Sequence, residues 1–207
     1  GTNGFRLDGE AGSDLSGYPV SSAGDINGDG YDDLIIGAGY ADINGTNSGS
    51  IYVVFGSASA FASTVNLSTL DGTNGFRLDG EAASDVSGIS VSSAGDVNGD
   101  GYDDLIIGAA YADINGSSSG SSYVVFGSGN AFASTVDLST LDGTNGFRLD
   151  GVATDDQSGF SVSSAGDING DGYDDLIIGA LDADFNGDQS GSSYVVYGGA
   201  KWGASAQ

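Results

Sequence analysis

The stretch DINGDGYDDLIIGA at residues 25–38 decides the fold of this chain, because it occurs three times. It returns as DVNGDGYDDLIIGA at 96–109 and as DINGDGYDDLIIGA at 167–180, so each copy begins 71 residues after the one before it. A second landmark, GTNGFRLDG at residues 1–9, returns twice with the same spacing. Repeats of this length are typical of solenoids, propellers and arrays.

Each repeat contains four short segments with the composition of β-strands. They are rich in β-branched and aromatic residues and are bounded by Gly, Asn, Asp and Ser. In the first repeat the predicted strands span Tyr18–Ser22, Asp33–Ala38, Ser50–Phe55 and Phe76–Gly80. The second is a continuous apolar run, as expected of a strand buried on both faces. We therefore predict an all-β fold built from four-stranded antiparallel β-propeller blades.

A right-handed β-helix is the alternative fold, but its coils are usually shorter than 71 residues. The polar stretch at 57–75 contains four apolar side chains, and we interpret it as a long connection that packs across the blade.

The position of the first residue within the repeat predicts how the blades divide. Residues 1–9 contain a lone copy of the fourth strand, which is expected to complete another blade. Blade 1 is expected at 10–80, blade 2 at 81–151 and blade 3 at 152–207, the last without its outer strand. Three blades are too few for a closed propeller, which typically has four to eight. We expect the N-terminal strand of one copy to complete the last blade of another copy, in a six-bladed ring of two chains or in a larger array.

The composition narrows the classes of function. The chain has 29 acidic residues, four basic residues and a formal net charge of −25, with no His and no Cys. This charge argues against nucleic acid or anionic lipid as a partner, and no apolar run approaches the roughly 18 residues of a membrane span.

The composition also argues against an enzyme. Without His or Cys, the usual catalytic bases and thiol nucleophiles are absent. Paired carboxylates leave a polysaccharide-degrading enzyme as a remote alternative. Catalytic residues should break the symmetry of a repeat, whereas nearly every acid recurs in register, so we predict no catalytic residue.

One loop in each repeat carries oxygen-bearing side chains at alternate positions. Side chains at positions one, three and five can converge on a cation when glycines let the backbone turn, and calcium takes six to eight oxygens. The seventh residue is expected to offer its carbonyl and the ninth its carboxylate. The predicted ligands are Asp25, Asn27, Asp29, Tyr31 and Asp33, then Asp96, Asn98, Asp100, Tyr102 and Asp104, and then Asp167, Asn169, Asp171, Tyr173 and Asp175. About three calcium ions per chain follow, one in each repeat.

The loop sequence has two alternative interpretations. An EF-hand needs a bidentate glutamate at position twelve, where this chain has isoleucine, so the loop is placed in the hairpin between the first two strands of a blade. A turn without metal stays open as an alternative. The acids just before the ninth position, Asp32, Asp103 and Asp174, are expected to face solvent.

Two further repeated features have structural interpretations. The loop at 42–45, which recurs at 113–116 and in altered form at 184–187, is predicted to be a solvated turn, with an additional cation as the alternative. The arginines at 6, 77 and 148 are expected to pair with a nearby aspartate.

The stretch from Ser21 to Ala38 resembles the FG-GAP repeat of integrin α-subunit β-propellers and of many bacterial surface proteins. The resemblance extends to all three repeats. It implies propeller blades whose hairpin loops bind calcium, and it gives the loop residues named above their role as ligands. Millimolar calcium outside cells suits such sites, so we expect an extracellular, secreted or cell-surface protein.

The sequence therefore predicts a calcium-binding structural or adhesive propeller module. The alternative is a calcium-stabilised recognition platform for a glycan or protein ligand. Such a platform should have an aromatic cluster in one repeat only, and Trp202 is the one residue that fits this requirement.

Overall fold

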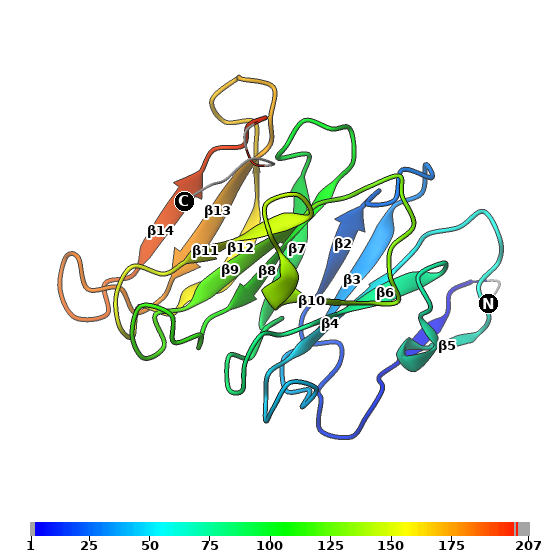
Figure 1. Cartoon of the computed structure of the whole chain (residues 1–207), viewed down its shortest axis with the longest axis horizontal. Helices are drawn as coiled ribbons and strands as arrows, with labels where there is room; N and C mark the ends of the chain where they lie inside the picture. Colours follow the sequence, from blue (N-terminus) through cyan, green and yellow to red (C-terminus); the bar gives the residue numbers. More distant parts are fainter. Residues whose placement is uncertain (1–2, 201, 203–207) are drawn as a thin grey trace.

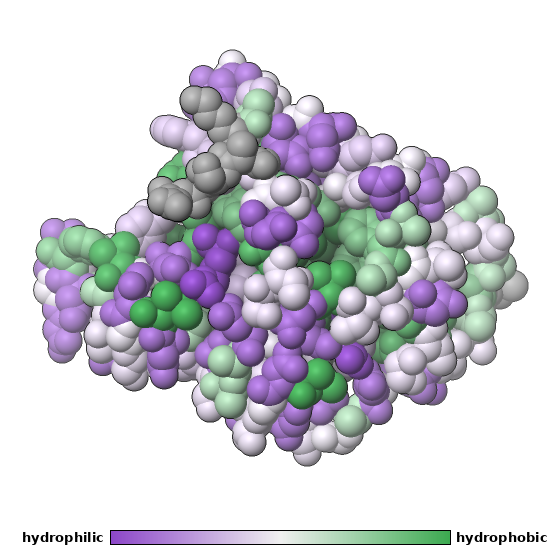
Figure 2. Space-filling view, in the orientation of Figure 1, coloured by the Kyte–Doolittle hydropathy of each residue, from purple (hydrophilic) through white to green (hydrophobic). Residues whose placement is uncertain are grey.

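The computed structural model describes residues 3–200 and 202. Within them the chain is all-β and forms four sheets, of which one is the two-stranded pair β1–β5. The other three sheets are the blades, which stand side by side in an open arc, with the first nearest the N-terminus and the third at the opposite side (Figure 1). The face shown in Figure 2 mixes hydrophilic and apolar residues, with one apolar patch at the left-hand edge over the loop that follows β13.

Blade 1 contributes four antiparallel strands to a five-stranded sheet. They are β2 (Val20–Gly24), β3 (Asp33–Ala38), β4 (Ser50–Val54) and β6 (Gly75–Asp79). The bounds agree with the predicted strands within two residues. In β4 all five residues are buried and in β3 five of the six, because these two strands lie in the middle of the sheet.

Blades 2 and 3 repeat this arrangement. Blade 2 contains β7 (Ser90–Gly95), β8 (Asp104–Ala109), β9 (Ser121–Val125) and β11 (Gly146–Asp150). Blade 3 contains β12 (Ser158–Gly166), β13 (Asp175–Ala180) and β14 (Ser192–Val196). Among the residues that the structure describes, no fourth strand follows β14, so the outer edge of blade 3 is open. These antiparallel sheets exclude the parallel β-helix and confirm the prediction of propeller blades, although the arc is not closed.

The long connection between the third and fourth strands has more structure than predicted. It contains β5 (Thr64–Asn66) and a 3₁₀ turn, η1 (Leu67–Thr69), and in the next repeat β10 (Thr135–Asp137) and η2 (Leu138–Thr140). Strand β10 pairs in parallel with β6, and β5 pairs in the same way with β1 (Arg6–Asp8). Each connection thus covers the exposed edge of the outer strand that precedes it, which a pattern search for strands of four or more residues does not detect.

The core lies between the blades. Ile35 and Val53 on blade 1 pack against Val91 and Leu105 on blade 2 in one buried cluster. A second cluster joins Ile106 of blade 2 to the strands of blade 3 in the same manner. In blade 2, which lies between the other two, the central strands therefore bury both of their faces, which explains their continuous apolar sequence.

An aromatic pair lies beside each of the outer-type strands β1, β6 and β11. Phe76 stacks on Phe132 with ring centroids 4.5 Å apart, and Phe5 stacks on Phe61 at 4.3 Å. In the third repeat Trp202 takes the second place, 4.4 Å from Phe147. The indole N–H of Trp202 donates to the carbonyl of Tyr197 at 3.1 Å. Trp202 therefore holds a packing position that phenylalanine holds in the other repeats.

Candidate metal loops

The predicted metal loops connect the first two strands of each blade. In blade 1 the loop leaves β2 at Gly24 and enters β3 at Asp33, as predicted. Gly28 and Gly30 have φ angles of +72° and +89°, a left-handed conformation that costs glycine little. These two residues let the loop turn back on itself, so that its side chains meet its own backbone.

The oxygens at positions one and three converge on the same amide. The amide N–H of Asp29 donates to Oδ1 of Asp25 at 3.0 Å and to Oδ1 of Asn27 at 2.9 Å. The other oxygen of Asp25 accepts from the amide of Gly30 at 2.9 Å. Two of the predicted donors therefore converge on one backbone amide of the loop.

The fifth position lies beside them and faces solvent. Oδ1 of Asp29 accepts from the amide of Tyr31 at 3.0 Å, and the side-chain amide of Asn27 donates to Oδ2 of Asp29 at 3.3 Å. The loops of blades 2 and 3 reproduce these contacts, since the amides of Asp100 and Asp171 each bond to the side chains at their own positions one and three.

The ninth position has a different environment. Asp33 is fully buried at the base of the loop, where its carboxylate accepts from the amide of Ile26 at 3.1 Å and from that of Gly56 at 2.7 Å. Burial raises the pKa of Asp33 to about 6 and that of Asp104 to about 8, and the nearby loop aspartates add to both shifts. This residue ties the hairpin to the end of the third strand.

The predicted ligands do not all lie together. Positions one, three and five are linked through shared hydrogen bonds, whereas the ninth carboxylate is engaged at the loop base. Within residues 3–200 and 202, no three acidic side chains lie together closely enough to hold a metal ion. The donor chemistry nevertheless suits calcium, because carboxylate and amide oxygens are hard ligands that this ion prefers.

The loops of neighbouring blades are joined by an acid that was expected to face solvent. Oδ2 of Asp103 accepts from the amide of Asp25 at 2.8 Å, and Oδ2 of Asp174 accepts from that of Asp96 at 2.9 Å. The expectation was wrong for these two residues because it considered one repeat alone. The partner of each acid lies 78 residues away in the preceding blade.

The arginines pair with aspartate, as predicted. Arg77 contacts Asp79 at 2.7 Å and also reaches Glu10 at 3.0 Å, and the hydroxyl of Tyr52 donates to the same glutamate at 3.0 Å. Blade 2 repeats this network with Glu81 as its acceptor. Glu10 and Glu81 are the only glutamates in the sequence, but each lies 67 residues from its arginine, so this link becomes visible only in the fold.

The second repeated loop forms a turn. Oδ1 of Asp42 accepts from the amide of Asn47 at 2.7 Å, and the side-chain amide of Asn44 donates to the carbonyl of Gly80 at 2.8 Å. These contacts account for its polar residues. No helix in the described part of the chain is long and apolar enough to cross a membrane.

All three repeats match one family of known proteins. The FG-GAP repeat family matches residues 18–54, 87–125 and 158–196, which together include the first three strands of every blade. The chain belongs to the FG-GAP repeat family. This confirms the resemblance found in the sequence.

Relatives of this FG-GAP chain include three integrin alpha chains. Integrin alpha-6 of Gallus gallus is 30% identical over 180 residues, which cover 84% of this chain and 14% of the relative. Integrin alpha-PS5 of Drosophila melanogaster is 31% identical and the match covers 85% and 16% of the two chains. Integrin alpha-IIb of Mus musculus is 30% identical, with 86% and 16% covered. The chain therefore spans about one sixth or less of the length of these relatives.

Proposed function

We propose that this FG-GAP chain is a calcium-binding structural and adhesive β-propeller module of an extracellular or cell-surface protein. The observation that carries the proposal is the convergence of the first and third loop oxygens on one amide, in all three repeats. A turn alone does not require two further acidic positions, five and nine, at fixed spacing in every repeat. The integrin names of the relatives support the adhesive role and the cell-surface location.

Calcium would act on the loops and on the contacts between them. Asp25, Asn27 and Asp29 would supply side-chain oxygens, with the carbonyl of Tyr31 and the carboxylate of Asp33 completing the set, and the other repeats would use their equivalents. When bound, the ion neutralises carboxylates that otherwise repel one another in a chain of net charge −25. Because Asp103 bonds to the backbone of the first loop, ordering one loop would also position its neighbour.

The proposed role of the blades is mechanical and not catalytic. Rigid, metal-clamped hairpins hold the loops at the rim of the arc in fixed positions, as an adhesive surface requires. A recognition platform for a glycan or protein stays an alternative prediction, since the blades differ in their exposed loop residues.

Calorimetry tests the calcium assignment directly. Titration of the metal-free chain with calcium is expected to give about three sites, and a tenfold excess over Kd should stabilise the fold by roughly 1.4 kcal/mol per site. The variant Asp100→Asn should lose the site in blade 2 and leave two sites. The matched control Asp113→Asn, in the second loop of the same blade, should keep three.

Two outcomes would reject the assignment. A melting temperature that is the same in excess calcium and in chelator would remove calcium from the function. Equal stoichiometry in the Asp100→Asn and Asp113→Asn variants would place the ions outside the predicted loops.

A further inference from the structure

We propose that the open side of blade 3 binds the N-terminal side of blade 1 in a second copy of this chain. The joint would repeat the contact that already exists between blades 1 and 2 and between blades 2 and 3. The proposal is independent of the adhesive role and rests on five matched features of the two free ends.

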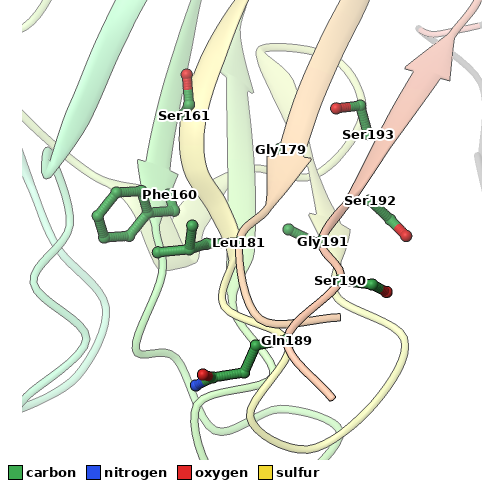
Figure 3. A pocket seen from close by; sticks show the side chains of 10 residues that line it. Phe160, Ser161, Gly179, Leu181, Gln189, Ser190, Gly191, Ser192 and Ser193 are labelled. Carbon is green, nitrogen blue, oxygen red and sulfur yellow. The ribbon is translucent and has the colours of Figure 1, made fainter. Parts of the chain in front are cut away.

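The first feature is a hollow on blade 3 where the next blade would pack. It has a volume of about 560 Å³ and is lined by Phe160, Gly179, Leu181, Gln189, Gly191 and Ser193, among others. Figure 3 shows Phe160 and Leu181 close together at one side of it, with Gly179 on the strand above. In blades 1 and 2 the loop of the following blade fills the equivalent space.

The glycines on the second strand of each blade show how closely the next blade packs there. A Cβ atom on Gly37 or Gly108 would clash with the carbonyl oxygen of a glycine in the next blade, Gly88 or Gly159. At Gly179 the nearest described atoms are 3.6 Å away and belong to Ser161 of the same blade. The glycine that approaches blade 1 or blade 2 has its equivalent at Gly17, near the start of the chain. Gly17 of a second copy is thus the residue that fits against Gly179.

The second feature is a set of backbone hydrogen bonds that joins neighbouring blades. At the two ends of the arc the donors and the acceptors of this set have no such partner blade. The amides of Val86 and Ser87 donate to the carbonyls of Asn47 and Ser48 at 3.0 and 3.1 Å. The amide of Gln157 donates in the same way to Ser118 at 3.0 Å. The repeat assigns the corresponding contacts at the joint to the amides of Leu15 and Ser16 in one copy and the carbonyls of Gln189 and Ser190 in the other.

The third feature is a pair of apolar faces that are buried inside the arc and exposed at its ends. Leu34, on the face of blade 1 that points away from blade 2, is 38% exposed, whereas the equivalent Leu105 in blade 2 is 0% exposed. Ile177, on the face of blade 3 that points away from blade 2, is 38% exposed, whereas the equivalent Ile106 in blade 2 is 0% exposed. Since Ile35 and Leu105 already pack in one cluster, Ile177 and a second copy's Leu34 have the same complementarity.

The fourth feature is the open edge of β14. In blade 1 the outer strand pairs with β4 in the register Ser50↔Asp79 and Tyr52↔Arg77. The same register sets Asp8 opposite Ser192 and Arg6 opposite Tyr194. The hydroxyl of Tyr194 is buried and has no hydrogen-bond partner among the described residues, whereas those of Tyr52 and Tyr123 donate to glutamate. Arg6 of a second copy would supply a donor for this oxygen.

The fifth feature is the end of the metal loop. The side chains of Asp103 and Tyr102 occupy the space beside Gly24 and Gly28 of the preceding loop. The equivalent glycines of blade 3, Gly166 and Gly170, have no described atom within 4 Å of an added Cβ. Tyr31 and Asp32 of blade 1, at the other end of the arc, are exposed. In a second copy, these two side chains would occupy the space beside the blade 3 glycines.

The joint requires two chains. Strands β1 and β14 lie at opposite sides of the arc, so one copy does not join its own ends (Figure 1). Two copies present two such joints, and two arcs of three blades would give six blades, within the four to eight of closed propellers.

The mass of the purified chain, measured by light scattering during gel filtration, is the first test. In excess calcium and in salt that screens the negative charge, we expect twice the 20.4 kDa of one chain. The variant Gly179→Ala should be a single chain with an unchanged circular dichroism spectrum, because its methyl group has room in one copy but clashes with the incoming Gly17. The control Gly12→Ala should remain a dimer, since the internal interface already has alanine at that position, Ala83.

Disulfide trapping tests the register. Ser50 and Asp79 lie within hydrogen-bond distance, at 3.1 Å, and so do Ser121 and Asp150, at 3.2 Å. A chain with Asp8→Cys mixed with a chain with Ser192→Cys should therefore form a cross-linked pair under mild oxidation. The control pair, Asp8→Cys with Ser193→Cys, should cross-link at least tenfold more slowly, because successive side chains of a strand point to opposite faces.

Three results would overturn the proposal. They are a single-chain mass for the wild type at all concentrations tested, a dimer that is unaffected by Gly179→Ala, and equal cross-linking of the two cysteine pairs. Any of these would show that the matched ends do not bind each other.

Discussion

Blade 2 and blade 3 have nearly the same sequence pattern but differ in how they are covered. Blade 2 has a neighbour on each face and an outer strand, β11, on its edge. Blade 3 has a neighbour on one face, and its last described strand, β14, has a free edge. Residues that are equivalent in the repeat are therefore buried in one blade and exposed in the other.

This difference shows that a blade is not the unit of stability. The apolar residues of β8 contact blade 1 on one face and blade 3 on the other. In repeat proteins stability is the sum of the terms within a repeat and between neighbours, so the terminal blade lacks one interface term. The comparison predicts unequal effects of the same substitution in the two blades.

The largest difference is expected for the isoleucine that faces the next blade. Ile106→Ala should lower the free energy of unfolding by about 3 to 4 kcal/mol, because it leaves a cavity between blades 2 and 3. Ile177→Ala should lower it by about 1 kcal/mol or less when measured with Gly179→Ala, which keeps the end of blade 3 open. Urea unfolding measures both values. Equal losses would mean that the two faces are covered alike.

A smaller difference is expected from a buried acid at the joint between blades 1 and 2. Burial raises the pKa of Asp85 to about 6, with further contributions from Glu81 and Asp113, while Arg148 opposes the shift. The folded chain therefore holds this proton more tightly than the unfolded chain, so the contribution of Asp85 to stability falls as the pH rises from about 4 to about 6.

The variant Asp85→Asn isolates this effect. Because asparagine does not ionise, the variant should gain about 1 to 3 kcal/mol on the wild type between pH 4 and pH 7.5. The measurement is thermal or urea unfolding at several pH values in chelator, which leaves the metal loops out of the comparison. A constant difference between variant and wild type across this range would contradict the burial of an ionised Asp85.

The smallest effect is expected in the glutamate network. Glu81→Gln weakens the ion pair with Arg148 and replaces the carboxylate to which the Tyr123 hydroxyl donates with a weaker acceptor, so a loss of about 1 kcal/mol is expected. The third repeat has Val152 at the equivalent position, and there Val152→Glu should stabilise the chain by giving Tyr194 an acceptor. Paired unfolding curves test both signs. Destabilisation by Val152→Glu would show that the third repeat does not form the glutamate–tyrosine contact of the other two.

Much of the fold was predictable because the repeat multiplies each local signal. One occurrence of a short apolar run does not distinguish a strand from a buried helix segment, but three copies bounded by the same turn residues do. The hairpin loop and its glycines were predicted for the same reason. The arginine pairs followed from the aspartate two residues further along each strand.

Other features could not be read from one repeat. Strand β5 has only three residues and forms because β1 offers an unpaired edge. Asp103 was predicted to face solvent because its partner, the amide of Asp25, belongs to another blade. The carboxylate of Asp33 was assigned to a cation from its spacing alone, and its two backbone partners come from separate ends of the hairpin.

The sequence by itself determined the period, the strands, the family and the oxygen-rich loops, because these depend on local spacing and on residue type. Only the tertiary structure decided which loop aspartates meet, which glycines are needed for close approach and which faces are left open. The physical reason is that these properties belong to contacts between blades. Such contacts join residues about 70 positions apart, and they exist only once the strands have formed sheets and the sheets have packed against one another.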